Sequence, residues 1–210
     1  MKFSTFSRSA ALLALTCTLA ACGGKATFPV TGTVTGLDYS GLVLSTNGMD
    51  LAVPAKATSF SFPNTLSYGE VYNVVQKVAP LHQSCTTVDP LTGRDTGTDT
   101  TGRLASVSII LTCAINTYTI GGTISVLNKD GSAGALAANE LVLTNGSAGG
   151  TVTPVAGATT FTFGTNVAYN VSYGVSVLTQ TNLNCTVTNG SGIMGDAAIT
   201  NIAVACTRTA

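Results

Sequence analysis

Cysteine is the residue type in this sequence with the clearest chemical potential. Four of the six cysteines lie in the body of the chain: Cys85, Cys113, Cys185 and Cys206. Metal and redox centres usually use a CxxC pair or combine cysteine with several histidines, whereas this chain has no CxxC and a single histidine. The four cysteines therefore indicate structural disulfides, which persist in exported compartments. Taken alone, four cysteines allow three pairings.

Nothing else in the chain forms a recognisable catalytic centre. A catalytic triad needs a nucleophile, a base and an orienting acid. His82 is the single histidine, and no serine or threonine lies in a nucleophile-elbow sequence that would make it the nucleophile for this base. Glu70 and Glu140 lie at different points of the internal repeat described below and form no obvious catalytic pair of carboxylates. We therefore predict that the protein is not an enzyme and needs no cofactor.

Two further groups of side chains have binding potential. Asp89, Asp95 and Asp99 share a Gly/Thr-rich stretch, and Ca²⁺ takes oxygen ligands from such loops. Their spacing matches no calcium loop, so a solvated loop is the preferred interpretation and no metal site is predicted. Tyr72 and Tyr169 each begin a Tyr-Asn-Val string and are predicted to be equivalent. Each is interpreted as a corner tyrosine packed on a β-sandwich, with a sugar-stacking platform as the alternative.

The N-terminus has the order of an export signal. Two basic residues precede an apolar run over 10–21, which is shorter than the about 20 apolar residues that a transmembrane helix needs. Residues 19–22, Leu-Ala-Ala-Cys, resemble the lipobox of bacterial lipoproteins. The resemblance implies a signal peptide over 1–21, cleavage before Cys22, a diacylglycerol on the Cys22 sulfur and often an acyl chain on the new N-terminus. The alternative is an ordinary signal peptide that leaves Cys22 unmodified.

Lipidation of Cys22 would place the protein at a membrane. Each buried methylene contributes about 0.8 kcal/mol, and two or more acyl chains hold a protein firmly. In the lipoprotein family an aspartate after the lipidated cysteine favours the inner membrane, and this chain has Gly23 there. The resemblance therefore implies the bacterial outer membrane, on its periplasmic or surface face, with 22–27 as a lipidated tether. Cys17 would be lost with the signal peptide.

The composition excludes some partners. Charged residues form 9% of the chain, against about 25% in typical soluble proteins, and Thr, Ser, Asn and Gly take their place. Nine basic and nine acidic side chains balance, and two of the basic ones, Lys2 and Arg8, belong to the signal. The mature chain is thus slightly acidic, and no nucleic-acid partner is predicted.

The remaining chain repeats itself, which decides between the cysteine pairings. The strings at 30–35, 42–45, 59–62 and 72–74 return at 120–125, 141–144, 160–163 and 169–171. Each half then has a cysteine before a Thr/Val segment and ends on an alternating strand that contains the other cysteine. A self-contained module must close its own bridge, so Cys85 is predicted to pair with Cys113 and Cys185 with Cys206.

Period-two alternation runs through both halves, and no long segment has helical spacing. The pattern predicts an all-β protein, with two tandem immunoglobulin-like antiparallel β-sandwiches after a helical signal peptide. The first sandwich is placed over 28–115 and the second over 118–209, with a short joint near 114–117 that should restrict swivelling. Phenylalanines two residues apart, Phe60 with Phe62 and Phe161 with Phe163, are predicted to face the cores.

The strings 30–35, 41–44, 60–62 and 69–74 resemble the carboxypeptidase-regulatory or transthyretin-like sandwich modules. They are also similar to tandem repeats of bacterial surface lipoproteins. The resemblance implies a fold and an extracytoplasmic, membrane-anchored module with a structural, adhesion or display role in the cell envelope. A module that binds glycans or peptides is the alternative, and an envelope protein or a glycan is the expected partner besides the membrane.

Overall fold

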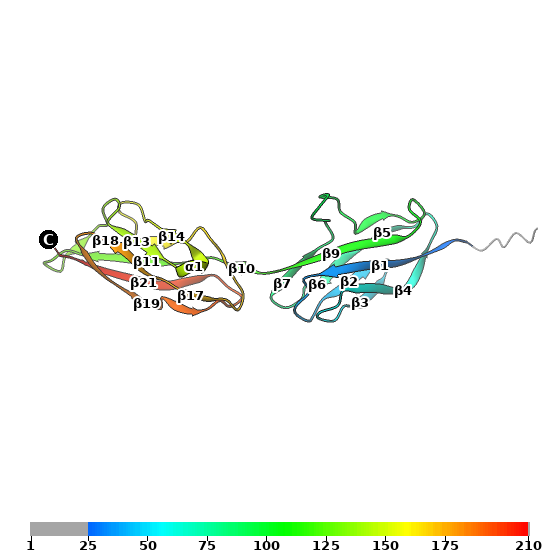
Figure 1. Cartoon of the computed structure of the whole chain (residues 1–210), viewed down its shortest axis with the longest axis horizontal. Coiled ribbons are helices and arrows are strands. Elements are labelled where there is room, and N and C mark those ends of the chain that lie inside the picture. The colour runs from blue at the N-terminus through cyan, green and yellow to red at the C-terminus, as the bar shows by residue number, and fades with distance from the viewer. Residues whose placement is uncertain (1–24, 210) are drawn as a thin grey trace, which may run out of the picture.

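A computed structural model of the chain describes residues 25–209. Almost all of its regular structure is β, and the one helix among these residues is the single turn α1 (Gly146–Gly149). The strands form two β-sandwiches that follow one another along the long axis of the molecule (Figure 1). The signal peptide and the predicted lipidation site at Cys22 lie outside the described residues.

The first sandwich contains nine strands. These are β1 (Thr27–Thr35), β2 (Val43–Thr46), β3 (Met49–Ala52), β4 (Ser59–Ser67), β5 (Val71–Asn73), β6 (Val75–Val78), β7 (Gln83–Thr86), β8 (Thr98–Thr100) and β9 (Val107–Ile115). One sheet has the order β4-β1-β9-β7, and the opposite side is formed by β3-β2-β6 and the pair β5-β8. All pairs are antiparallel except β1 with β9, the first and last strands, which run parallel.

The second sandwich has the same order of pairing with some additions. Its strands are β10 (Thr117–Tyr118), β11 (Ile120–Leu127), β12 (Ala133–Gly134), β13 (Leu141–Thr144), β14 (Thr151–Val152), β15 (Thr160–Thr162), β16 (Val167–Ala168), β17 (Ser172–Gly174), β18 (Ser176–Gln180), β19 (Leu183–Thr188), β20 (Ser191–Ile193) and β21 (Ile199–Arg208). In one sheet β15, β11, β21 and β19 correspond to β4, β1, β9 and β7. Again the first long strand, β11, runs parallel to the last, β21.

Each sandwich has its own hydrophobic core, and the two cores share no residue. Alternating side chains of the closing strands enter them; Ile109 and Leu111 of β9 are almost completely buried, as are Ile202 and Val204 of β21. Burying one such side chain contributes about 1.5–3 kcal/mol. The paired phenylalanines face the cores as predicted, and all four are buried: Phe60, Phe62, Phe161 and Phe163.

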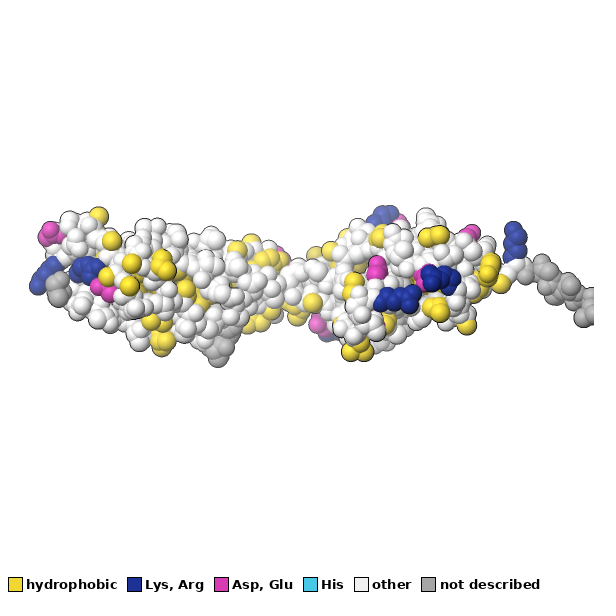
Figure 2. Space-filling model, turned by 90° about the horizontal axis from the view of Figure 1, so that it is seen from above, with side chains coloured by type: hydrophobic (Ala, Val, Ile, Leu, Met, Phe, Trp, Pro, Cys, Tyr) yellow, Lys and Arg dark blue, Asp and Glu magenta, His cyan; other side chains and the backbone are white. Residues whose placement is uncertain are grey.

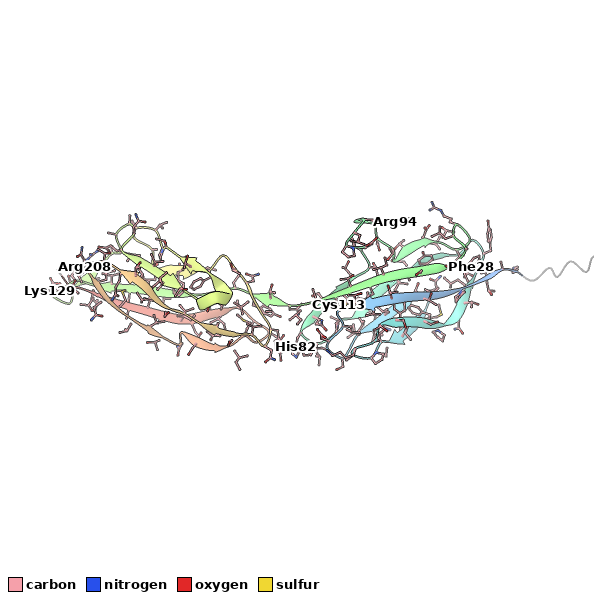
Figure 3. The ribbon with its side chains drawn as sticks, in the orientation of Figure 1. Phe28, His82, Arg94, Cys113, Lys129 and Arg208 are labelled. Carbon is pink, nitrogen blue, oxygen red and sulfur yellow. A yellow bond between two sulfur atoms is a disulfide. The ribbon has the colours of Figure 1, made fainter. Side chains whose placement is uncertain are left out.

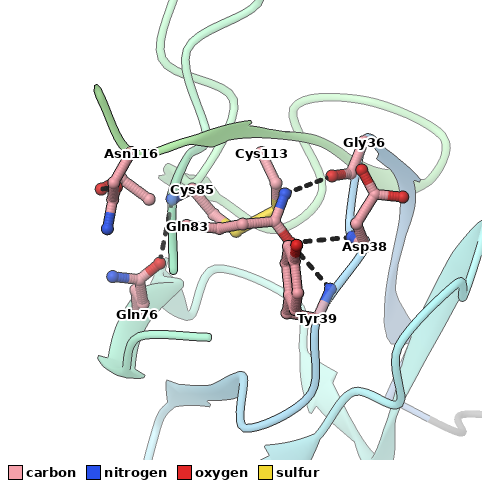
Figure 4. The surroundings of a disulfide bond; sticks show 9 residues. Gly36, Asp38, Tyr39, Gln76, Gln83, Cys85, Cys113 and Asn116 are labelled. Atoms are coloured by element: carbon pink, nitrogen blue, oxygen red, sulfur yellow. Dashed lines mark hydrogen bonds between the residues drawn. A yellow bond between two sulfur atoms is a disulfide. The ribbon is translucent and has the colours of Figure 1, made fainter. Parts of the chain in front are cut away.

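Both predicted disulfides are present. Cys85 bonds to Cys113, and Cys185 bonds to Cys206. In each case the two cysteines are directly opposite on neighbouring antiparallel strands, with their Cα atoms 4.0 Å apart. The bridges therefore join the closing strand to the edge strand of the same sheet and do not cross the sandwich. Figure 4 shows the bridge of the first sandwich, between Cys85 and Cys113.

One predicted strand is divided in the structure. The alternation over 71–77 predicts a single strand, but the segment breaks at Val74, because β5 pairs with β8 whereas β6 pairs with β2. The Val74 side chain is buried and its N–H donates to the Gly97 carbonyl, so the chain changes partner there. The pairing strand β8 lies in the stretch between the two cysteines that was interpreted as a solvated loop.

Candidate functional site

The contacts that join the two sandwiches form the most specific cluster of side chains in the structure, and they centre on His82. This residue lies in the turn before β7, at the end of the first sandwich that faces the second (Figure 3). Its ring stacks on that of Tyr169 from the second sandwich, with centroids 3.7 Å apart and planes within 4°. Tyr39, in the connection between β1 and β2, meets both rings edge-on, at 5.1 Å and 5.8 Å. Stacked and edge-to-face contacts are the geometries that aromatic pairs prefer.

A carboxylate of the second sandwich orients the same ring. Nδ1 of His82 lies 2.8 Å from each side-chain oxygen of Asp196, which is in the connection between β20 and β21. An ionised carboxylate only accepts hydrogen bonds, so Nδ1 is the donor. The His82 side chain is only 21% exposed. A hydrogen bond across the joint and a stack on its face thus hold one ring in place.

The position of Asp196 is unusual for its sandwich. The second sandwich has only five charged residues, namely Lys129, Asp130, Glu140, Asp196 and Arg208. Lys129 and Arg208 mark its far end (Figure 3), Asp130 adjoins Lys129, and Glu140 is paired with Arg208. On the face that Figure 2 shows, the middle of this sandwich is largely free of charged side chains. Asp196 is therefore the one charged residue of the second sandwich that lies at the end facing the first.

The backbone of the joint is hydrogen-bonded to both sandwiches. Strand β9 runs to Ile115 and β10 begins at Thr117, so only Asn116 separates them, a shorter joint than the expected 114–117. The Asn116 N–H donates to the His82 carbonyl, and the Asn116 carbonyl accepts from the Tyr169 N–H, both at 2.9 Å. Its side-chain oxygen also accepts from the Ser84 hydroxyl at 2.8 Å. Because β10 pairs with β16, the chain leaves no free linker at this point.

The backbone conformation at His82 explains how the ring reaches the joint. His82 has φ 58°, in the left-handed region, and the corresponding residue of the second sandwich is Asn182 with φ 56°. The two positions match because the His82 carbonyl accepts from Asn116 N–H and the Asn182 carbonyl accepts from Thr209 N–H. Asparagine or glycine usually occupies this conformation. The first sandwich has instead a residue whose ring can pack on the second.

A buried glutamine holds the Tyr39 connection beside His82. Gln83 is 1% exposed. Its side-chain oxygen accepts from the N–H groups of Asp38 and Tyr39, and its amide nitrogen donates to the Gly36 carbonyl (Figure 4). The corresponding residue of the second sandwich, Leu183, is apolar and makes no such bonds. Sequence reasoning missed this role, because a glutamine at the start of a strand gives no signal of burial.

The arrangement has no catalytic geometry. Within residues 25–209 no hydroxyl or thiol is hydrogen-bonded to His82, so the His82–Asp196 pair has no nucleophile to activate. Its contacts are those of a mechanical joint, in which each group restricts rotation of one sandwich against the other.

The carboxylates considered as metal ligands have separate partners. Asp89 accepts from the Thr92 hydroxyl and the Leu91 N–H, Asp95 accepts from the Thr87 hydroxyl, and Asp99 is paired with Arg94 and Arg103, so the three loop carboxylates have different partners. In the part of the chain that the structure describes, no three His, Cys, Asp or Glu side chains are placed to hold a metal ion. Among the same residues, none of the helices has the length and apolar character to span a membrane.

The two glutamates have structural contacts. Glu70 accepts from the Ser67 N–H at 3.0 Å. Glu140 receives two hydrogen bonds from Arg208, at 2.8 Å and 3.2 Å, and the guanidinium keeps the pKa of this carboxyl below its ordinary value. This pair ties the last strand to the connection before β13.

The predicted equivalence of Tyr72 and Tyr169 is wrong. Tyr72 lies on β5 opposite Asp99, and the residue in the same place on β17 is Tyr173, opposite Gly192. The buried valines two residues further along support this correspondence, because the Val74 N–H donates to the Gly97 carbonyl and the Val175 N–H donates to the Gly190 carbonyl. The Tyr-Asn-Val string of the second half is shifted by four residues, which places Tyr169 at the joint.

His82→Asn is expected to loosen the joint without destabilising the first sandwich. Asparagine suits the left-handed turn, as at Asn182, but it lacks the ring that stacks on Tyr169, and an aromatic pair contributes about 0.5–1.5 kcal/mol. ¹⁵N relaxation of the chain from residue 25 onward would measure this. The wild type should tumble with one rotational diffusion tensor, and the variant should show two faster, separate tensors.

The matched control is Asn182→His, which makes the reciprocal exchange at the far end of the second sandwich. It should leave the relaxation data unchanged. If His82→Asn also tumbles as one body, the ring does not restrict the joint.

No known family profile and no curated protein matches this sequence. Among solved structures, the chain is similar to the Bacillus anthracis TIE protein, with 12% identity and a TM-score of 0.39 over 87% of this chain and 34% of that one. It therefore spans about a third of that protein's length. It is also similar to a C-terminal fragment of the pilus adhesin SpaC from Lactobacillus rhamnosus GG, with 12% identity and a TM-score of 0.37 over 88% and 98% of the two chains. The major pilin T3.2 of Streptococcus pyogenes gives 11% identity and 0.30 over 88% and 98%. Values this low indicate a distant likeness and assign no function to this chain.

Proposed function

We propose that this protein is a lipid-anchored spacer of the bacterial cell envelope. Cys22 would hold it to the outer membrane, and the two sandwiches would form a stiff rod that displays its far end, or a partner, away from that membrane. The observation that carries this proposal is the joint, where His82, Tyr39, Tyr169, Asp196 and the backbone of Asn116 connect the sandwiches. A spacer is useful only if its joint resists bending, and these contacts serve that end.

The surface and the cross-links support the same role. A largely uncharged Thr/Asn/Ser surface offers few sites for nonspecific electrostatic attraction. Each sandwich has a disulfide that ties its closing strand to an edge strand, a bond that persists in exported compartments. The short tether from Cys22 to the start of β1 at Thr27 would keep the first sandwich close to the membrane.

Cys22→Ala should release the protein from the membrane fraction. Without the thiol, no diacylglycerol is attached, and the acyl chains that would hold the mature chain are lost. The measurement is fractionation of cells that express the full-length chain, with mass spectrometry of the mature N-terminus. Wild type should sediment with outer membranes and carry a lipid mass on Cys22, and the variant should be found mainly in soluble fractions.

Cys17→Ala is the matched control, since it removes a cysteine of the same export signal that should be cleaved away. It should leave both the fractionation and the lipid mass unchanged. An unmodified Cys22 in the wild type, or a Cys22→Ala variant that sediments like wild type, would overturn the lipid anchor.

A further inference from the structure

We propose that the first sandwich binds a neutral saccharide in a hollow between β5, β8 and the loop that leads to β8. The hollow has a volume of about 270 Å³, close to the lower limit of about 300 Å³ for ligand pockets in general. Arg94 lies on the loop that projects from the side of this sandwich (Figure 3). The lining residues that the argument uses are Tyr72, Arg94, Asp95, Asp99 and Leu104.

The hydroxyl of Tyr72 lies at the hollow. The residue is 5% exposed and lines the hollow. Its hydroxyl makes no hydrogen bond within residues 25–209 and is open to solvent in the hollow. Burial raises the pKa of Tyr72, with the charges of Asp99 and Asp95 acting in the same direction, so the phenol keeps its proton. A ligand in the hollow would therefore meet a neutral hydroxyl that can donate and accept.

An arginine and two aspartates are already oriented beside this hydroxyl. The side chain of Asp99 is only 10% exposed and is held by Arg94 at 3.2 Å and Arg103 at 2.9 Å. The Thr100 N–H, followed by the Arg103 charge, lowers the pKa of Asp99, which keeps this carboxylate ionised. Because Arg94 uses one nitrogen on Asp99, its remaining N–H groups stay available to a ligand.

Asp95 supplies the complementary acceptor. One of its oxygens accepts from the Thr87 hydroxyl at 2.7 Å and from the Gly97 N–H at 2.8 Å. The other oxygen has no partner within the described part of the chain. The hollow thus has a fixed carboxylate acceptor, guanidinium donors and a phenol, with the exposed side chain of Leu104 as an apolar edge.

This set of groups selects the class of ligand. A small anion would meet three carboxylates, because Asp89 also lines the hollow, and a bare cation would meet Arg94. A neutral polyhydroxyl compound has hydroxyls that donate to carboxylates and accept from guanidinium and phenol, and C–H groups that pack on Leu104. A saccharide has all of these features.

The second sandwich serves as an internal comparison without such a hollow. Gly192 takes the place of Asp99 opposite Tyr173. A Cβ added at Gly192 would be 2.7 Å from the Tyr173 hydroxyl, so that ring fills the space. The loop that supplies Arg94 and Asp95 is reduced there to a tight turn between β19 and β20 at 189–190. The site belongs to the first sandwich alone, and it is independent of the spacer function.

The test is ¹⁵N NMR titration of the chain from residue 25 onward with four neutral disaccharides: maltose, cellobiose, lactose and N,N′-diacetylchitobiose. At least one should shift amide signals of residues 72 and 89–104 in a saturable way at millimolar concentration. Tyr72→Phe removes only the hydroxyl and should weaken that binding two- to tenfold, as one hydrogen bond contributes about 0.5–1.5 kcal/mol. Tyr173→Phe, the matched change in the second sandwich, should leave it unchanged.

Three outcomes would overturn the proposal. The first is that none of the four disaccharides shifts these signals when it is present at millimolar concentration and in 20-fold excess over the protein. The second is that Tyr72→Phe binds as tightly as wild type. The third is that CaCl₂ or sodium sulfate, titrated separately, saturates the same amides and the sugars do not. None of these results bears on the fractionation of Cys22→Ala, so the two proposals fail separately.

Discussion

Replacing Gly122 with alanine is expected to destabilise the second sandwich by about 3 kcal/mol or more, at the upper end of the range for overpacked positions. Gly122 lies on β11 between β15 and β21. A Cβ there would be 1.9 Å from the Ile202 carbonyl oxygen and 2.7 Å from its carbon. Both atoms belong to the backbone of the neighbouring parallel strand, so two central strands would have to separate.

A loss of this size is a large share of the about 5–15 kcal/mol that stabilises a domain. Urea denaturation of the chain from residue 25 onward, followed by circular dichroism, would measure it. The transition of the second sandwich should move to lower urea, while that of the first should stay in place. The corresponding glycine of the first sandwich is Gly32, whose added Cβ would be 2.5 Å from the Phe60 ring and 2.6 Å from the Ile109 carbonyl oxygen.

Gly164→Ala is the matched control. No atom lies within 4 Å of a Cβ built at Gly164, and its φ is not in the left-handed region. The change should stay within about 0.5 kcal/mol of wild type, as is usual at open surface positions. Equal stability of Gly122→Ala and Gly164→Ala would show that β11 and β21 are not as close as described.

Removing the second disulfide with Cys185→Ala and Cys206→Ala together should lower the stability of the second sandwich by about 3 kcal/mol. The bridge closes a loop with a sequence separation of 21, and the chain-entropy model gives about this value for such loops. The corresponding pair in the first sandwich, Cys85→Ala with Cys113→Ala, has a separation of 28 and should cost a similar amount.

Urea denaturation with and without a reducing agent checks both double variants. A reducing agent should destabilise wild type in both transitions, and each double variant should respond only in the sandwich that keeps its bridge. If removal of one bridge shifted both transitions equally, the two sandwiches would unfold as one unit and the contacts at the joint would dominate their stability.

Much of the fold could be predicted because its signals are local or repeated. Alternation with period two marks the long strands and predicts them over 28–35, 105–113, 118–126 and 198–206, so β1, β9, β11 and β21 lie within a few residues of their expected places. The Phe60–Phe62 spacing identified a core-facing strand, since residues two apart share a face. The repeat of the cysteines selected one pairing of three.

The joint and the hollow could not be predicted in the same way. Tyr169, His82 and Asp196 are distant in sequence, and no local pattern links a ring to a carboxylate 114 residues away. The short string that includes Tyr169 even favoured the wrong register, because Tyr-Asn-Val recurs four residues before the position that corresponds to Tyr72. Strand β8 was missed, since Thr-Asp-Thr has no apolar alternation.

The sequence by itself determined the all-β class, the pairing of the four cysteines in two disulfides, and the core-facing sides of the strands, because strand periodicity and repetition are properties of the chain alone. Only the tertiary structure decided which residues meet at the joint and which side chains line the hollow. Those outcomes depend on how loops from different strands approach one another in space, and on the register at which each strand pairs.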